Sequence, residues 1–296
     1  MTSLEMLAER VEAGDTVTPA DARILAESRD LIAVGMMADG VRRRLHGLAT
    51  TFVRVFEVHV NAVPASLPVS LAAGEIRIVG QPQSLAEAVS VVSSIRAIVG
   101  TTPITGFSLA SVSRLGGSLR DIGRQLQEAG LDAIAEVSLD EVETAGAAAI
   151  DDIRAGGLNA YRLAVQQYDD HSQAAVLNRA AELQRSVGGF RAFAPLPRVV
   201  SAVTPTTGYD DVKLVATARL MVTNIPSIQV DWPLYGPKLA QVALTMGADD
   251  VDGVAAFDPA TLGSRRSALA EIVGNIGAAG QNPVERNGRF EAPAPA

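Results

Sequence analysis

A glutamate and a histidine two residues apart are the first side chains in this 296-residue sequence that could do chemistry together. Glu57 and His59 stand in the run TFVRVFEVHVN, where polar and apolar residues alternate as they do in a strand. Successive side chains of a strand point to opposite faces, so Glu57, His59 and Asn61 are expected to share one face. A carboxylate beside an imidazole can serve as an acid–base pair. The alternative interpretation is a hydrogen-bonded polar plug at the top of the fold.

Arg162 is the third candidate for catalysis. It stands among apolar residues, where it can bind an anion or form a salt bridge with a carboxylate such as Glu57. Of these two interpretations the sequence favours the salt bridge. Three further acidic residues, Asp249, Asp250 and Asp252, look like a chelating group, but their spacing is not that of a calcium-binding loop. We therefore interpret them as solvent-exposed turn residues followed by the end of a strand.

The absence of cysteine limits the possible chemistry most strongly. A chain with no cysteine has no disulfide, no catalytic thiolate, no thiolate-bound zinc and no ordinary iron–sulfur cluster. Its three histidines, His46, His59 and His171, are far apart in the sequence, so a multi-histidine metal site is not expected. There is no GxSxG motif, no GxGxxG after the first strand and no phosphate-binding GxxxxGKS/T. The sequence therefore predicts neither a metal nor a cofactor.

Composition and charge exclude two classes of partner. The formal net charge of −8 argues against binding to nucleic acid or to an anionic membrane surface. No apolar run approaches the roughly 18 residues of a membrane-spanning helix. The first residues, MTSLEMLAERVEAG, lack the basic and apolar regions of a signal peptide, so a cytoplasmic location is expected.

The elements that must position these side chains alternate regularly along the chain. Residues 1–48 predict three helices, of which the second has Thr18 as its N-cap and Pro19 in its first turn, and the third ends at Gly47. The predicted strands are residues 51–60, 75–80, 104–109, 131–137, 158–165, 190–196, 227–232 and 249–257. Each strand is followed by a predicted helix, one of them capped by Ser118.

Eight strand–helix units predict a parallel (β/α)8 barrel of the TIM type. The expected organisation is a helical extension over residues 1–48, a barrel with its closing helix over residues 49–290, and a loose tail over residues 291–296. Barrel enzymes carry their sites at the carboxyl ends of the strands. The ligand-binding candidates on that basis are Asn61, Gln81, Gln229, Asp231 and Trp232. Trp232, the only tryptophan, can form the floor of a pocket or simply pack.

The helix expected over residues 236–247 has apolar residues at helical spacing. Leu239, Val242, Ala243 and Met246 are expected to form the face that docks on the sheet, and Gly247 is expected to stop the helix.

Four segments carry a family resemblance. ADGVRRRLHG, VGGFRAFAPL, ATARLMVTNIPSIQVDWPLYGPKLAQVALTMGADDVDG and NPVERNGRF closely resemble, in the same order, the radical-SAM enzymes of the futalosine route to menaquinone. Aminofutalosine synthase is the most similar, while dehypoxanthine futalosine cyclase and the deazaflavin-forming enzymes are more distant. The resemblance implies a radical-SAM-like barrel, in agreement with the alternation of elements.

The departures from the family pattern concern its chemistry. The resemblance implies a CxxxCxxC loop after the first strand, holding a [4Fe–4S] cluster that cleaves S-adenosylmethionine. Here residues 59–61 are followed directly by AVPASLPVSLAAGEIRIVG. The Gly-Gly motif expected after the second strand reads Gly80-Gln81-Pro82, and the motifs after the fourth, fifth and eighth strands have also changed. Because radical chemistry needs a thiolate-bound cluster, we do not expect radical-SAM catalysis. The loss of the surrounding cofactor motifs also argues against simple binding of S-adenosylmethionine.

Three functions remain open from the sequence. The first is a non-catalytic partner or scaffold for a menaquinone-pathway enzyme, with the helices around residues 211–246 as the contact surface. The second is a protein that binds a small aromatic or nucleoside-like ligand. The third is a cofactor-independent enzyme that uses Glu57, His59 and Arg162.

Overall fold

The computed structural model describes residues 2–68, 71–140, 142–168, 173–199, 206–257 and 268–292, with the backbone alone for residues 142–145. The chain divides into two compact units. The first unit comprises Met1–Thr50, Ala164–Val251 and Gly274–Pro283, and the second unit comprises Thr51–Leu163, Asp252–Val273 and Val284–Ala296. Each unit is described by itself. The predicted division at residues 48 and 290 stays a prediction, and residues 293–296 of the expected tail lie outside the described residues.

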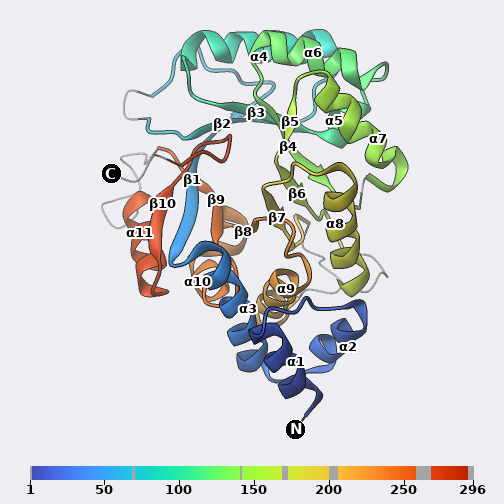
Figure 1. Cartoon of the computed structure of the whole chain (residues 1–296). Coiled ribbons are helices and arrows are strands. Elements are labelled where there is room, and N and C mark those ends of the chain that lie inside the picture. The colour runs from blue at the N-terminus through green and yellow to red at the C-terminus, as the bar shows by residue number, and fades with distance from the viewer. Residues whose placement is uncertain are drawn as a thin grey trace. The chain divides into compact units, whose positions relative to one another are not determined.

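The described strands form a parallel barrel (Figure 1). Hydrogen-bonded neighbours follow one another in the order β1-β2-β3-β4-β6-β7-β8-β9, and β1 also pairs with β9. The strands are β1 (Ala49–His59), β2 (Glu75–Val79), β3 (Ile104–Ser108), β4 (Ala133–Ser138), β6 (Arg162–Ala164), β7 (Ala192–Ala194), β8 (Ser227–Asp231) and β9 (Asp250–Ala255). The eight-stranded α/β barrel predicted from the sequence is confirmed. The strand predicted over residues 158–165 consists of two short pieces, β6 and β5 (Asn159–Ala160), of which β5 pairs with β4. One short strand that was not predicted, β10 (Asn282–Glu285), pairs with β1.

In the second unit, helices pack beside the strands β1 to β4 (Figure 1). They are α4 (Leu85–Val99), α5 (Leu109–Ser113), α6 (Leu119–Ala129) and α7 (Val142–Ala155). The predicted cap is confirmed, since the side chain of Ser118 accepts a hydrogen bond from the amide of Asp121. The helix α11 (Ala268–Ala278) follows later in the chain.

The first unit packs its helices tightly. They are α1 (Ser3–Glu12), α2 (Pro19–Glu27), α3 (Leu31–His46), α8 (Gln173–Val187), α9 (Gly208–Met221) and α10 (Trp232–Leu244). α3 lies against α9, and residues of α1, α2, α3 and α9 share one apolar core. The predicted capping by Thr18 and the end of α3 at Gly47 are both confirmed. No helix within the described ranges is both long enough and apolar enough to cross a membrane.

The predicted docking face of α10 is correct in part, since Ala243 is buried and Met246 packs against the apolar core. Val242 is 46% exposed, whereas Ala240, Ala243 and Leu244 are buried. The helix begins four residues earlier than expected and kinks at Gly236, whose φ of 76° lies in the left-handed region. Gly247 follows the helix rather than ending it, because the last helical residue is Leu244.

Gly247 permits a close approach in the first unit. Its φ is +104°, and a Cβ atom there would lie 2.9 Å from Cβ of Arg219 and 3.0 Å from Cβ of Ala38. Gly14 has a similar φ of +99°, but a Cβ atom there would meet no atom within 4 Å. Alanine substitutions at the two glycines therefore distinguish the cost of backbone strain from the cost of steric crowding.

We predict that Gly247→Ala lowers the free energy of unfolding by about 3 kcal/mol, because strain and overpacking add. Gly14→Ala is the matched control, with an expected loss of about 1 kcal/mol from strain alone. Urea denaturation followed by circular dichroism measures both. Equal losses in the two variants would contradict the crowding at Gly247.

Candidate functional site

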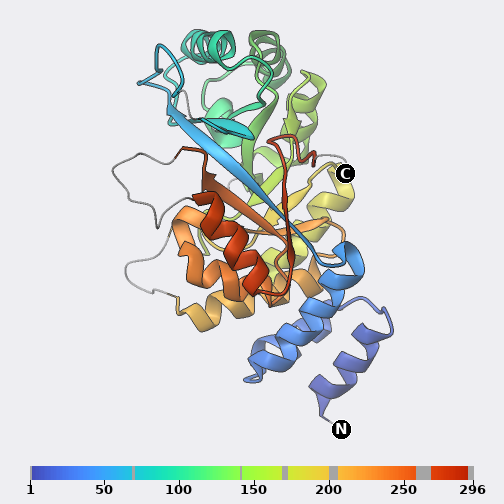
Figure 2. The same cartoon turned by 90° about the vertical axis from the view of Figure 1, so that its left-hand side faces the viewer.

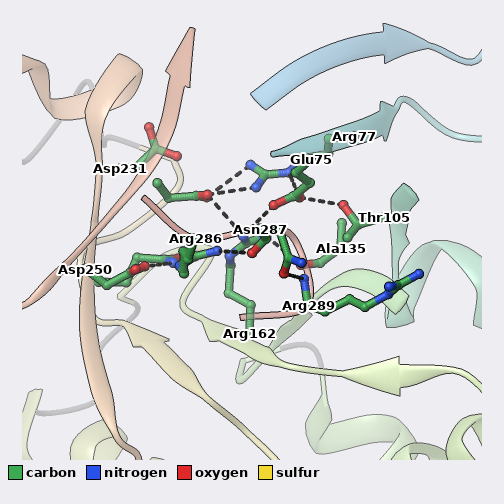
Figure 3. A network of polar contacts seen from close by, with 12 residues as sticks. Glu75, Arg77, Thr105, Ala135, Arg162, Asp231, Asp250, Arg286, Asn287 and Arg289 are labelled. Atoms are coloured by element: carbon green, nitrogen blue, oxygen red, sulfur yellow. Dashed lines mark hydrogen bonds and ion pairs between the residues drawn. The ribbon is translucent and has the colours of Figure 1, made fainter. Parts of the chain in front are cut away.

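The polar centre of the second unit is a network of buried ionic groups, here called the Asp252 network (Figure 3). Its members are Glu75, Arg77, Thr105, Arg162 and Asp252, all of which are buried. Glu75 and Arg77 are two residues apart on β2, so they share one face of the strand. β3 contributes Thr105, β6 contributes Arg162 and β9 contributes Asp252.

Asp252 is the common acceptor of two arginines. Nη1 and Nη2 of Arg77 donate to its two carboxylate oxygens at 3.0 and 2.8 Å, which is a bidentate pair. Nη2 of Arg162 donates to Oδ1 at 3.0 Å, and Nη1 of Arg162 donates to the carbonyl oxygen of Ala135 at 2.8 Å. Arg162 is thus held on two sides by acceptors from other strands.

Glu75 completes the network. Its Oε1 accepts hydrogen bonds from Nε of Arg77 at 2.8 Å and from the hydroxyl of Thr105 at 2.6 Å. Its Oε2 has no hydrogen-bond donor among the described residues, and Nη2 of Arg162 lies 3.7 Å away. Two carboxylates and two guanidinium groups therefore balance one another in charge within this set.

The arginines keep both carboxylates ionised. Burial opposes the charged form of Asp252, but Arg162 and Arg77 outweigh burial and hold the pKa of this carboxyl well below its usual range. Burial likewise opposes ionisation of Glu75, and Arg77 and Arg162 lower its pKa. Groups fixed in one charge state do not exchange protons near neutral pH. The Asp252 network is therefore suited to holding strands together and unsuited to acid–base catalysis.

The segment NPVERNGRF crosses the start of β2. The amide of Gly288 donates to the carbonyl oxygen of Gly74 at 3.0 Å, and a Cβ atom on Gly288 would lie 2.9 Å from Cγ of Glu75. The guanidinium of Arg286 lies 3.8 Å from the ring centroid of Phe290, a cation–π contact. Nη2 of Arg289 donates to Asp132 at 2.7 Å. This segment covers Glu75 at the amino end of its strand.

A second buried ionic group lies in the first unit. Nη2 of Arg219 binds Oδ1 of Asp249, while its Nε and Nη1 donate to the carbonyl oxygens of Gly247 at 2.9 Å and Pro226 at 3.0 Å. Nε2 of His46, at the end of α3, lies 3.2 Å from Oδ2 of Asp249 and 2.8 Å from the carbonyl oxygen of Pro226. Asp249 thus ties α3 and α9 to the start of β9.

The interpretation of Asp249, Asp250 and Asp252 as solvent-exposed residues is wrong, because all three are buried. Asp249 is paired with Arg219, and Asp250 accepts a hydrogen bond from Nε2 of Gln229 at 2.6 Å. Each carboxylate has a donor that comes from a distant part of the chain, which no local spacing reveals.

The structure separates the three catalytic candidates. Glu57 and His59 are exposed near the carboxyl end of β1, whereas Arg162 is bound in the Asp252 network, where it forms ion pairs with Asp252 and Glu75. The favoured interpretation of Arg162 as a salt-bridge residue agrees with this geometry, although Glu57 is not the partner. A catalytic role for these side chains stays a prediction.

Two of the ligand-binding candidates lie near His59 in the second unit. The amide of Asn61 donates to Nδ1 of His59 at 3.3 Å. The imidazole packs over Gly80, where a Cβ atom would lie 3.0 Å from Nε2. The side-chain amide of Gln81 donates to the carbonyl oxygens of Pro82 and Ser111, each at 3.1 Å. These contacts order the loop after β2 in this conformation.

The other three candidates belong to the first unit. Gln229 is buried against Asp250. Asp231 caps α10, since its Oδ1 accepts from the amide of Leu234 at 2.8 Å, and its Oδ2 binds Arg198 at 2.8 Å. Trp232 is buried as the first residue of α10. Each residue thus has a structural role, and ligand binding by any of them stays a prediction.

The side chains present do not fit the cluster that the resemblance implies. A [4Fe–4S] cluster is held by thiolates, and the chain has no cysteine. Across the described residues, no three histidine, aspartate or glutamate side chains lie close enough together to hold a metal ion.

We predict that Asp252→Ala lowers the free energy of unfolding by about 4 kcal/mol, because two buried arginines lose their shared carboxylate. Glu128→Ala removes the exposed pair with Arg124 in the same unit and serves as the control, with an expected loss of at most about 0.5 kcal/mol. Urea denaturation measures the difference. A loss at Asp252 as small as that at Glu128 would show that the network does not hold the unit together.

Comparisons with known proteins find similarity in one part of the chain. The family profile described as the CofH/MqnC C-terminal region matches residues 191–294. Aminodeoxyfutalosine synthase from Streptomyces coelicolor is 34% identical over 134 residues, which cover 38% of this chain and 35% of that protein. The enzyme of the same name from Thermus thermophilus is 36% identical over 131 residues, covering 38% of this chain and 34% of that protein. The chain therefore aligns with about a third of the length of these relatives.

The fold extends beyond the region of sequence similarity. The crystal structure of methylornithine synthase (PylB) superposes with a TM-score of 0.65 at 15% identity, covering 94% of this chain and 97% of that one. At such low identity the likeness establishes the barrel fold alone. The sequence matches alone carry the relationship, and they show a distant, partial homology of this cysteine-free chain to aminodeoxyfutalosine synthase and the CofH/MqnC C-terminal region.

Proposed function

We propose that this chain is a non-catalytic member of the futalosine-route barrels that acts as a protein partner of a menaquinone-pathway enzyme. The observation that carries the proposal is a contrast within the chain. Asp252 and Asp249, the buried carboxylates at the centre of the two ionic groups, are paired with arginines, while the thiolates that radical chemistry needs are missing. A fold kept without its chemistry supports a role in binding.

The matched region supports the same conclusion. Arg219, Asp249 and Arg286 all lie within residues 191–294, and each of them contacts other residues of this chain. The matched region therefore contains side chains that stabilise the fold. These residues say nothing in favour of a retained substrate site.

The geometry favours a partner over a cofactor-independent enzyme. Arg162 is bound by two carboxylates, and Glu57 and His59 are exposed rather than enclosed. An acid–base pair becomes effective when burial or a neighbouring charge tunes its pKa.

Within the contact surface expected around residues 211–246, α10 is the helix that exposes large apolar side chains. α9 is buried along most of its length, from Asp211 to Met221. On α10, by contrast, Leu234 is 42% exposed and Val242 is 46% exposed. Contiguous apolar surface favours a protein contact, and we take these two side chains as parts of one such surface. We therefore assign the partner contact to the outer side of α10.

The proposal predicts that the tagged chain co-purifies with an aminodeoxyfutalosine synthase expressed beside it. Val242→Asp is expected to weaken this co-purification at least tenfold, because a charge would be buried in the contact. Leu48→Asp, at another exposed apolar position of the first unit, is the matched control and should leave the yield unchanged. Isolation of the chain without the synthase, at concentrations where both are abundant, would refute the proposed partner.

A second prediction concerns the pathway in cells. Deleting the gene in a host that makes menaquinone by the futalosine route should lower menaquinone and raise an intermediate before the assisted step. The wild-type gene should restore both levels, and the Val242→Asp gene should not. Mass spectrometry of the quinone and the intermediates measures the effect, and an unchanged menaquinone level would refute a role in the route. Stabilisation of the purified chain by an aromatic or nucleoside compound in a thermal shift assay would instead support a small-molecule binder.

A further inference from the structure

The surface of the N-terminal helices carries an apolar groove. α1 and α3 lie side by side (Figures 1 and 2), and the groove between them has a volume of about 360 Å³. Its apolar lining consists of Ala8, Val11, Ala33, Met36, Met37 and Gly40. Small residues on both walls leave the groove open, since alanine and glycine do not fill it.

An apolar ridge stands beside the groove. Met36 is 71% exposed and Ile32 is 69% exposed. They are four residues apart on α3, so they lie on the same side of the helix. Met36 is a flexible side chain that protrudes beside a groove lined by small residues. Such a surface can receive a second surface of the same shape.

The polar lining of the groove consists of one acidic and one basic residue. Glu12 lies on the α1 wall and Arg44 on the α3 wall. Nη2 of Arg44 donates to the carbonyl oxygen of Val11 at 2.9 Å, which places Arg44 beside the residue before Glu12, at the same end of the groove. Neither side chain forms an ion pair with any described residue. Opposite charges thus face each other across one end of the groove.

This arrangement is complementary to itself under a two-fold rotation. A two-fold axis along the groove places α1 of one copy over α3 of the other. Glu12 then faces Arg44 of the second copy, and Arg44 faces Glu12 of the second copy. Met36 of each copy faces the α1 side of the other groove, where Ala8 leaves space. In such a symmetric contact the same surface must be complementary to itself in shape and in charge.

We propose that the α1–α3 groove is the interface of a homodimer, occupied by the same groove of a second copy of this chain. The proposal does not rest on the proposed partner of α10, which uses a different surface. The proposed interface is apolar along the groove and has two symmetry-related Glu12–Arg44 ion pairs at one end.

Sedimentation equilibrium of the full chain tests the interface. The wild-type chain is expected to be a dimer at tens of micromolar. Met36→Asp is expected to raise the dimer dissociation constant at least tenfold, because it buries a charge at the centre of the contact. Val242→Asp is the matched control on α10 and should leave the dimer intact. Circular dichroism confirms that each variant is folded, and Ile32→Asp provides a second reading should Met36→Asp misfold.

Charge exchange tests the two-fold arrangement itself. Glu12→Arg and Arg44→Glu should each weaken the dimer, because like charges then face each other. The double variant restores both pairs with reversed sign and should regain much of the affinity. A wild-type monomer, a dimer broken by Val242→Asp and kept by Met36→Asp, or a double variant weaker than both single variants would overturn the proposal. Failure here leaves co-purification through α10 unaffected, so the two proposals fail separately.

Discussion

The sharing of one buried carboxylate between two arginines is the interaction on which the second unit depends. Asp252 accepts hydrogen bonds from Arg77 and Arg162, which come from β2 and β6. An unpaired charge in a protein interior is costly, and a buried pair is tolerated only when its geometry is nearly complete. Removing any charged member of the network therefore leaves a buried opposite charge without its partner. The strands of this unit are therefore held in register by the pairing of buried charges as well as by apolar packing.

A related constraint operates in the first unit through Asp249. Arg219 reaches it from α9 and His46 reaches it from α3. Arg42, also on α3, is fully buried and donates to Asp39 at 2.8 Å and to the carbonyl oxygen of Gly47 at 3.2 Å. The family-like segments ADGVRRRLHG and LTMGADDVDG thus consist largely of residues that stabilise the fold. The resemblance reports how the barrel is built, and function has to be argued from the surfaces and sites that remain.

The strands and helices could be predicted from the sequence because their signals are local. Alternation located every barrel strand, and capping residues such as Thr18 and Ser118 located helix starts. The buried state of Asp249, Asp250 and Asp252 could not be predicted, because their partners are distant in sequence. Arg162 was expected in a salt bridge, but its partners came from strands that only the fold brings together. The face of α10 was predicted only in part, because apolar residues at 239–240 and 242–244 leave more than one helical face possible by spacing alone.

The separation between Arg77 and Asp252 along the chain has a kinetic consequence. They are 175 residues apart, so their contact closes a loop of more than half the chain. Long loops are entropically expensive to close, and contacts of this kind slow folding more than local ones do. Interactions absent from the folding transition state act mainly on the rate of unfolding. If this ion pair forms late, it works as a latch that slows the opening of the folded barrel without guiding its assembly.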